Sequence, residues 1–305
     1  MRFAISIPQE VPDGTFDPVR LRNYLTRAES FGFHSAWTQE TVLGSAPILA
    51  PLELMTFAAA CTERLHLGCS VFVSPLHNPI HFAKSISTLD QLSRGRVEVG
   101  VATGGRSRMF SAFEADPASL VARFTEGLQL MKACWTESSI TFAGRFWQLD
   151  DAALEPKPFQ KPYPPLWIGG SHPAAVRRAL QYGNGFFGAG RSSTAQFAQQ
   201  VQVLRAALTE AKQDPSTFPI AKRVYIVVDD DATRAHERIE AGLKRAYGAS
   251  GLADIAVYGP PSACIKGLRE VAEAGAELIL LHVLPDEAEQ MERLATEVIS
   301  QMQDE

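Results

Sequence analysis

The chain has 305 residues, of which 46% are hydrophobic and 21% charged, a composition typical of a globular protein with one large domain or two ordinary ones. Its net charge is −5 and its isoelectric point is near 5.9, which argues against non-specific binding to nucleic acid, because such binding usually needs a basic surface. No apolar run approaches the roughly 18 residues that a membrane helix requires, so no membrane partner is expected.

The N-terminal segment MRFAISIPQEV is interpreted as a strand and not as a signal peptide, because its apolar stretch is short and alternating. A cytoplasmic location is the resulting expectation. Four cysteines are scattered without a C-x-x-C pair, which predicts reduced, buried thiols. His77 and His81 have the H-x-x-x-H spacing but enclose Asn78, Pro79 and Ile80, so zinc-protease chemistry and a metal site are not expected.

Short runs typical of strands alternate with longer runs of helical periodicity. In the first helical run Asp17 is a candidate N-cap, Pro18 suits the first turn and Gly32 suits the end. Strands are predicted at 2–7, 35–39, 65–73, 96–102, 165–170, 185–190, 223–228 and 278–283. Helices are predicted at 17–32, 51–63, 79–93, 118–135, 173–183, 194–213, 231–247, 261–275 and 285–303.

This repetition indicates parallel strands joined by crossover helices. Eight strand–helix units favour a (β/α)8 TIM barrel over a six-stranded doubly wound sheet. Two segments, 136–164 and 248–260, are longer than a connection needs, and we expect both insertions near the active face of the barrel. Because no internal repeat or low-complexity tail interrupts the pattern, we predict a single domain over residues 1–305.

The stretch GRVEVGVATGGRSR, residues 95–108, has the glycines of a phosphate-binding turn. It contains the fourth predicted strand and lacks G-x-G-x-x-G spacing, whereas a Rossmann fingerprint belongs in the first strand–helix turn, so a Rossmann site is not predicted. The preceding segment LSRGR is interpreted as structural, with Gly95 suited to a left-handed helix end and Arg94 near the negative pole of that helix.

Three segments in chain order resemble the luciferase-like monooxygenase superfamily, barrel enzymes that use reduced FMN or the deazaflavin coenzyme F420. They are GFHSAWTQE, LHLGCSVFVSPLHNPIHFAKSISTLDQLSRGRVEVGVATGG and KPYPPLWIGGSHPAAVRRALQYGNGFF, and the likeness spans about residues 1 to 290. The resemblance implies a cofactor ring over the C-terminal ends of the strands. It also implies a cis peptide between Ser70 and Val71, which forms a bulge behind that ring.

Two glycine-rich loops are candidates for binding the cofactor phosphate. After the fifth strand, glycines precede Ser171 and a helix start, where free backbone N–H groups attract anions. After the sixth, glycines precede Arg191, which can form a forked contact with phosphate. With the resemblance, the predicted cofactor-binding set is Gln39, Ser70, Val71, Thr103, Gly104, Arg106, Gly170, Ser171, Gly188, Gly190, Arg191 and Ser192.

The acid–base residue is not inherited from the family. Some members carry a histidine after the second strand and a glutamate after the fourth, where this chain has Thr41 and Gly105. Glu40 and His77 are the predicted catalytic substitutes, with Gln39 and His172 as further candidates, although each also suits an ordinary loop or helix-start role. Trp37 is predicted to belong to the core.

The favoured hypothesis is an oxidoreductase that transfers a hydride between F420 and a small organic substrate. A reduced-FMN monooxygenase and a non-catalytic flavin-binding relative are the alternatives. An unrelated Schiff-base aldolase is disfavoured because the predicted strands contain no lysine. From the family we expect a homodimer, with a separate flavin or F420 reductase as a further candidate partner.

Overall fold

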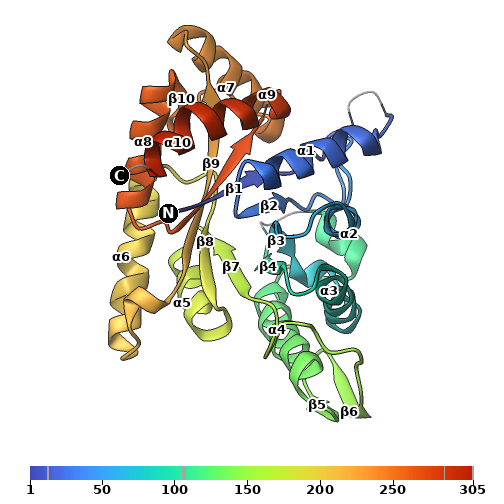
Figure 1. The fold of residues 1–305 in the computed structure, drawn as a ribbon. Coiled ribbons are helices and arrows are strands. Elements are labelled where there is room, and N and C mark those ends of the chain that lie inside the picture. The colour runs from blue at the N-terminus through green and yellow to red at the C-terminus, as the bar shows by residue number, and fades with distance from the viewer. Residues whose placement is uncertain (12–13, 105–107, 285, 304–305) are drawn as a thin grey trace.

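The computed structural model describes residues 1–11, 14–104, 108–284 and 286–303. In this part of the chain a parallel sheet closes into a ring that helices surround (Figure 1). The strand order is β10-β9-β11-β1-β2-β3-β4-β7-β8, and β8 also pairs with β9, so that β10 alone stands outside the eight-stranded ring. The predicted (β/α)8 TIM barrel is confirmed.

All eight predicted strands and their connecting helices are present, with shifted ends. The barrel strands are β1 (Arg2–Ser6), β2 (Ser35–Thr38), β3 (His66–Val73), β4 (Val97–Ala102), β7 (Leu166–Gly170), β8 (Gly185–Gly188), β9 (Ile220–Val228) and β11 (Leu278–Val283). The helices are α1 (Pro18–Ser30), α2 (Pro51–Cys61), α3 (Pro79–Ser93), α4 (Leu120–Thr136), α5 (Pro173–Tyr182), α6 (Thr194–Glu210), α7 (Ala232–Tyr247), α8 (Pro261–Glu273), α9 (Glu287–Arg293) and α10 (Ser300–Gln303). None of the described helices is long and apolar enough to cross a membrane.

Side chains at the helix ends account for several of these boundaries. Asp17 accepts hydrogen bonds from the N–H groups of Val19 and Arg20, as expected of an N-cap. Helix α3 ends with Arg94 at φ 55° and Gly95 at φ 84°, so the left-handed turn predicted for the glycine begins one residue earlier. The LSRGR segment is therefore a helix end that leads into β4.

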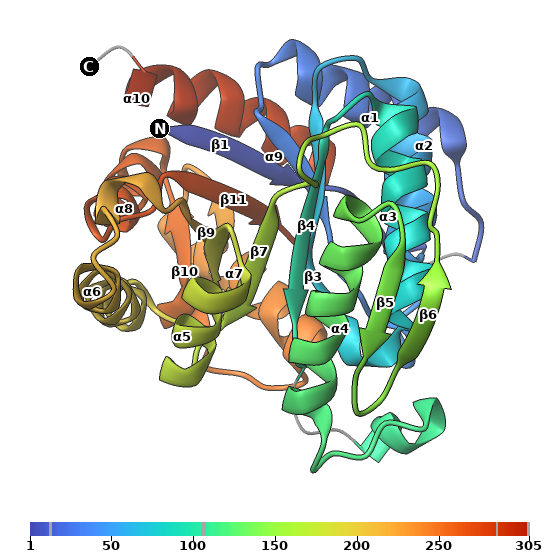
Figure 2. The same cartoon turned by 90° about the horizontal axis from the view of Figure 1, so that it is seen from below.

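The two insertions form different structures. Segment 136–164 forms the hairpin β5 (Ile140–Ala143) and β6 (Gln148–Ala152), which lies outside the ring of strands beside α4 (Figure 2). Its returning part is held at the N-terminal end of β4, where Gln160 donates hydrogen bonds to Asp90 and to the Val97 carbonyl. The segment starts at the opposite end of the barrel, but its hairpin runs back along α4, where Trp147 and Pro79 of α3 each lie 3.7 Å from the position of a Cβ on Gly127. Its place near the active face stays a prediction.

Segment 248–260 does border the C-terminal face. It contains β10 (Ala256–Gly259), which pairs with β9 from Tyr225 to Val228. In the strand register Tyr225 of β9 pairs with His282, one residue before β11 ends. The part of β9 that pairs with β10 therefore continues beyond the mouth of the ring.

Aromatic rings fill the bore of the barrel. Trp37 and Trp167 pack edge to face, with ring centroids 6.4 Å apart, and Phe187 contacts both. The ring of Trp37 occupies the space where Gly68 lacks a side chain. Trp37 is 1% exposed, which confirms its predicted place in the core.

Gly100 of β4 lies opposite an irregularity in β3, where the strand register shifts between Cys69 and Phe72. A Cβ on this glycine would stand 2.1 Å from the backbone oxygen of Cys69. Because backbone cannot rotate away as a side chain can, we expect Gly100→Ala to lower the free energy of unfolding by about 3 kcal/mol. Denaturant unfolding checks this against the exposed loop variant Gly44→Ala, and equal stability of the two variants would contradict it.

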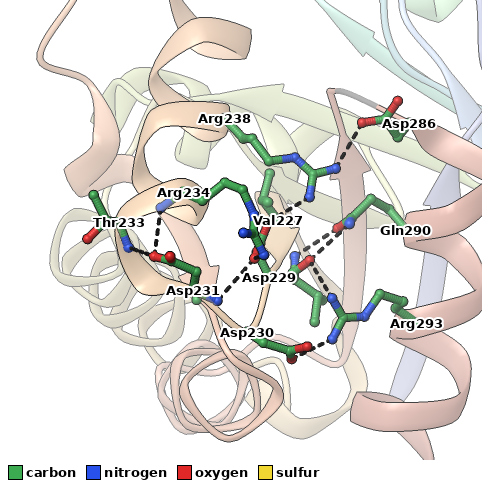
Figure 3. A network of polar contacts seen from close by, with 12 residues as sticks. Val227, Asp229, Asp230, Asp231, Thr233, Arg234, Arg238, Asp286, Gln290 and Arg293 are labelled. Carbon is green, nitrogen blue, oxygen red and sulfur yellow. Dashed lines mark hydrogen bonds and ion pairs between the residues drawn. The ribbon is translucent and has the colours of Figure 1, made fainter.

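A buried carboxylate joins the end of β9 to two helices on this face (Figure 3). Asp229 accepts hydrogen bonds from Arg234 and Arg238 of α7, and Arg238 also contacts Asp286. Arg234 lowers the pKa of Asp229 well below its usual range, chiefly through the hydrogen bond, so this carboxylate is charged at neutral pH. Gln290 of α9 bonds both backbone groups of the last β9 residue. The network fixes the strand that continues beyond the barrel mouth.

Candidate active site

Glu40 and His77 form a hydrogen-bonded pair at the C-terminal ends of β2 and β3. The Glu40 carboxylate accepts from His77 Nε2 at 2.7 Å through one oxygen and from the Val73 N–H at 2.6 Å through the other. Its side chain is only 3% exposed, whereas that of His77 is 25% exposed. His77 also stacks on Phe82 of α3, with ring centroids 4.7 Å apart. The two predicted catalytic residues thus meet, with the imidazole on the accessible side.

A second polar cluster lines the mouth between β2, β9 and β11. Gln39 contacts the ring of His282 at 3.3 Å and accepts a hydrogen bond from Arg223, which also donates to the Ser70 carbonyl at 3.2 Å. Burial, with a contribution from Arg223, lowers the pKa of His282 to about 3. This histidine is therefore neutral at pH 7. Arg223 is the functional candidate that the sequence interpretation missed.

The peptide bond between Ser70 and Val71 is cis, as the resemblance implied. The Val71 side chain enters the space where Gly169 has none, with its Cγ1 2.7 Å from the position of a Cβ. The Ser70 hydroxyl is buried, and no group in the described part of the chain bonds it. This unpaired hydroxyl belongs to the residue whose carbonyl accepts from Arg223.

The end of β4 forms another part of the mouth. Gly104 has φ 72°, and a Cβ there would lie 2.7 Å from Val73 Cγ1, so this glycine allows close packing against the end of β3. Thr103 is partly exposed, and its hydroxyl bonds the Gly104 carbonyl at 3.3 Å. Gly105 and Arg106, which also belong to the predicted loop, lie outside the described residues.

A cavity of about 560 Å³ lies between the starts of α5 and α6, where the phosphate site was predicted. Ser171 comes from the loop after β7, and Arg191 and Ser192 come from the loop after β8. Gln200 bridges the loops by donating to the Ser171 carbonyl and the Ser192 hydroxyl, both at 3.2 Å. Its own side-chain oxygen is buried and is bonded by no described group. The lining also includes Pro173, Val176, Gln196, Gln199 and Val203.

The glycines of these loops have packing roles of their own. Gly170 has φ 157°, near the edge of the region that favours glycine. A Cβ on Gly188 would meet the ring of Phe197 at 2.6 Å, and one on Gly190 would meet Arg223 at 2.6 Å. Close packing therefore explains why glycine stands at positions 188 and 190. It also leaves little space around Arg223 at the mouth of the barrel.

The helix starts next to this cavity are partly capped by side chains. His172 accepts from the Ala174 N–H at the start of α5, so this candidate acid–base residue serves as an N-cap. Ser193 and Gln196 form a capping box at the start of α6. An anion in the cavity would therefore depend mainly on Arg191 and on the hydroxyls of Ser171 and Ser192.

No lysine was expected inside the barrel, and the one lysine that the observed strand β9 adds lies outside the bore. Strand β9 starts at Ile220, three residues before the predicted strand, and it includes Lys222. Its neighbour Ala221 faces the bore with Trp37 and Trp167, so the alternation of strand side chains directs Lys222 outward to Phe197 of α6. The lysine does not reach the bore, which argues against Schiff-base chemistry there.

No group of histidine, cysteine, aspartate and glutamate side chains within the described ranges could hold a metal ion. The cysteines found there are free thiols.

A family model described as luciferase-like monooxygenase matches residues 1–251. The chain belongs to the luciferase-like monooxygenase family. This luciferase-like chain is 32% identical over 243 residues to an F420-dependent glucose-6-phosphate dehydrogenase of Beutenbergia cavernae, covering 73% of the chain and 68% of that relative. It is 28% identical over 220 residues to an FMNH2-dependent dimethylsulfone monooxygenase of Pseudomonas putida, covering 71% and 56%.

Among solved structures, monooxygenase RslO1 from Streptomyces bottropensis matches the luciferase-like chain with a TM-score of 0.86 at 20% identity, covering 99% of the chain and 100% of RslO1. That likeness shows the fold alone. The chain spans about half to two thirds of the length of several curated relatives that it matches. The curated relatives include dehydrogenases, a ketoreductase and monooxygenases, so the family of this chain includes F420- and FMN-dependent oxidoreductases.

Proposed function

We propose that this enzyme transfers a hydride between a small organic substrate and F420 at the C-terminal face of the barrel. The observation that carries the proposal is the Glu40–His77 pair. When a hydride moves between an alcohol and a cofactor, a proton must also leave or reach the substrate oxygen, and a positioned histidine is suited to move it. Oxygenation by reduced FMN places no such demand on a substrate hydroxyl.

The unpaired polar atoms of the site fit a cofactor of this kind. The Ser70 hydroxyl would face the ring together with Gln39 and Arg223, and Arg191, Ser171 and Ser192 would hold the phosphate. When bound, the cofactor supplies the hydride acceptor or donor, and the protein supplies orientation and electrostatics.

His77 is the proposed catalytic residue, and Glu40 is its positioning residue. An ionised carboxylate only accepts hydrogen bonds, so Nε2 of His77 carries the proton that points to Glu40. Nδ1 is then the basic nitrogen, which takes the hydroxyl proton of an alcohol or returns it to a carbonyl oxygen. Glu40 holds the imidazole in this tautomer and stabilises the imidazolium that forms.

Parallel calorimetric titrations of the protein with F420 and FMN test the proposal, followed by assays with a panel of secondary alcohols and F420. We expect tighter binding of F420 and alcohol-dependent reduction of it. Preference for FMN, with oxygen consumption in the presence of reduced FMN, would instead support the monooxygenase alternative that the dimethylsulfone monooxygenase relative suggests. If the protein binds neither cofactor, both enzymatic hypotheses are contradicted and the hypothesis of a non-catalytic relative is favoured.

The homodimer and the cytoplasmic location are proposals carried over from the sequence. A separate flavin reductase would be needed only if the FMN alternative holds, because reduced FMN must then be supplied. Sedimentation of the purified chain, alone and with added cofactor, tests the dimer.

Arg191→Ala should weaken cofactor binding at least several-fold, and about ten-fold if the guanidinium donates directly to the phosphate. Arg191 is exposed, lines the cavity and is held over the ring of Tyr247, 5.2 Å from the centroid, so it is placed without a carboxylate partner among the described residues. Calorimetry measures the change, with the exposed residue of α1 in Arg22→Ala as the charge-matched control. An affinity equal to that of the control would refute the role.

A further inference from the structure

Lys222 is a buried cation that the mechanism above does not use. Only 2% of its surface is exposed, and its ammonium lies 5.9 Å from the centroid of the Phe197 ring. Its side chain passes over Gly188, where a Cβ would lie 3.1 Å from Lys222 Cδ. The lysine therefore rises between β9 and α6 toward the loop that follows β8.

The ammonium group holds that loop at both ends. Nζ donates to the Ala189 carbonyl and, at 2.8 Å, to the Ser192 carbonyl. Gly190 and Arg191 lie between these two carbonyls, and Arg191 and Ser192 line the cavity proposed for phosphate. Lys222 thus supports from beneath the segment that would contact an anion.

The surroundings of Lys222 are poor in negative charge. Its strand partners in β8 and β11 are Gly188 and Ile279, α6 contributes Phe197, and no carboxylate in the described part of the chain forms an ion pair with it. Burial, with a smaller contribution from the cation of Arg223, lowers its pKa to about 7. This pKa lies close to neutral pH, so a charge placed nearby can change the protonation of Lys222 there.

We propose that Lys222 is a positioning residue of the phosphate loop and takes up a proton from solvent when a phosphate group occupies the cavity beside Ser192. This inference rests on the proposed function, because it assigns that cavity to the cofactor phosphate. An anion in the cavity provides the opposite charge that the empty site lacks, and opposite charge favours the ammonium form.

The sign of the pH dependence follows from linkage. The bound anion raises the pKa of Lys222 above its value in the free protein, so affinity is highest below pH 7 and falls as the pH rises above it. Between the pKa of the free protein and the higher pKa of the complex, the dissociation constant should rise with pH, by up to about ten-fold per pH unit for this single proton. At pH 7.5 binding should be accompanied by the uptake of a fraction of a proton, and of no more than one.

Calorimetric titration with F420 and with FMN, in two buffers of different ionisation enthalpy, measures this proton uptake in the wild-type enzyme. Lys222→Arg keeps a charge that does not titrate, so it should retain binding and lose the uptake and the pH dependence. Lys222→Met should bind more weakly and show no uptake from this site. Lys266→Met, which removes an exposed lysine of α8, should behave as wild type.

The phosphate of FMN has its own pKa near 6 and can also exchange a proton on binding. This exchange is the same for wild type and all variants, so it cancels when their proton uptake is compared. Cofactor binding with the same proton uptake in wild type and Lys222→Arg would overturn this inference and leave the proposed function intact. If neither cofactor binds the wild-type enzyme, both this inference and the proposed function are overturned.

Discussion

Glu40→Gln should slow substrate turnover by roughly 100- to 10,000-fold, which is the usual contribution of a positioned acid–base group. Both oxygens of the native carboxylate accept hydrogen bonds, one from the Val73 N–H and one from His77 Nε2. If the glutamine oxygen keeps the Val73 contact, its NH2 group faces His77 and donates to Nε2. The proton of the imidazole then moves to Nδ1, which can no longer take a proton from an alcohol.

Turnover of the best alcohol from the F420 panel measures this effect, and calorimetry measures F420 affinity alongside it. We expect the affinity to stay within about two-fold, because the substitution alters no group assigned to the phosphate or the ring. Glu53→Gln, at an exposed position of α2, is the matched control. Turnover of the Glu40 variant close to that of the control would remove Glu40 from the mechanism.

Arg96→Met should lower the free energy of unfolding by about 3 kcal/mol or more, since it leaves several buried carbonyls unpaired. Arg96 is 8% exposed and precedes β4. Its guanidinium donates to the carbonyls of Ala59 and Thr62 at the end of α2, of Leu65 before β3 and of Ser93 at the end of α3, and to the Thr62 hydroxyl. One side chain thus satisfies the C-terminal carbonyls of two helices.

Denaturant unfolding of Arg96→Met beside Arg94→Met checks this prediction. Arg94 is exposed and only two residues away, so its variant removes the same charge without the buried hydrogen bonds. Lysine cannot replace Arg96 fully, because its single ammonium cannot reach acceptors spread over two helix ends and a strand. A difference of less than about 1 kcal/mol between the two methionine variants would show that the carbonyls find other partners.

Much of the fold could be predicted because its signals are local. Alternating apolar residues mark each strand, Asp17 and Gly95 mark helix ends, and eight strand–helix repeats leave few architectures other than a closed barrel. The start of β9 was placed too late because Lys222 interrupts its apolar pattern. Lys222 can occupy this strand because its ammonium lies near the ring of Phe197 and donates to loop carbonyls. No local sequence pattern shows that Phe197 and these carbonyls are nearby.

The candidate site was predicted only in part. The two loops that form the phosphate cavity, with Arg191 and Ser192, could be recognised because each combines glycines, polar donors and a helix start within a few residues. Arg223 was missed, although its strand alternates and places it on the same side as Ala221. Its significance comes from Gln39 and Ser70, which are more than 150 residues away in the chain.

The sequence by itself determined the barrel, the ends of most helices and the loops that border the mouth, because these depend on residues close together in the chain. Only the tertiary structure decided that Glu40 meets His77, that Arg223 joins Gln39, and that Lys222 holds the loop after β8. Glu40 and His77 follow the paired strands β2 and β3, and Lys222 lies beside the end of β8, with which β9 pairs. Arg223 lies in β9 and Gln39 follows β2, and these strands are not neighbours, so the curvature of the ring brings the two residues together. The hydrogen bond from His77 gives the Glu40 carboxylate its proposed role, and the pairing of β2 with β3 makes that contact possible.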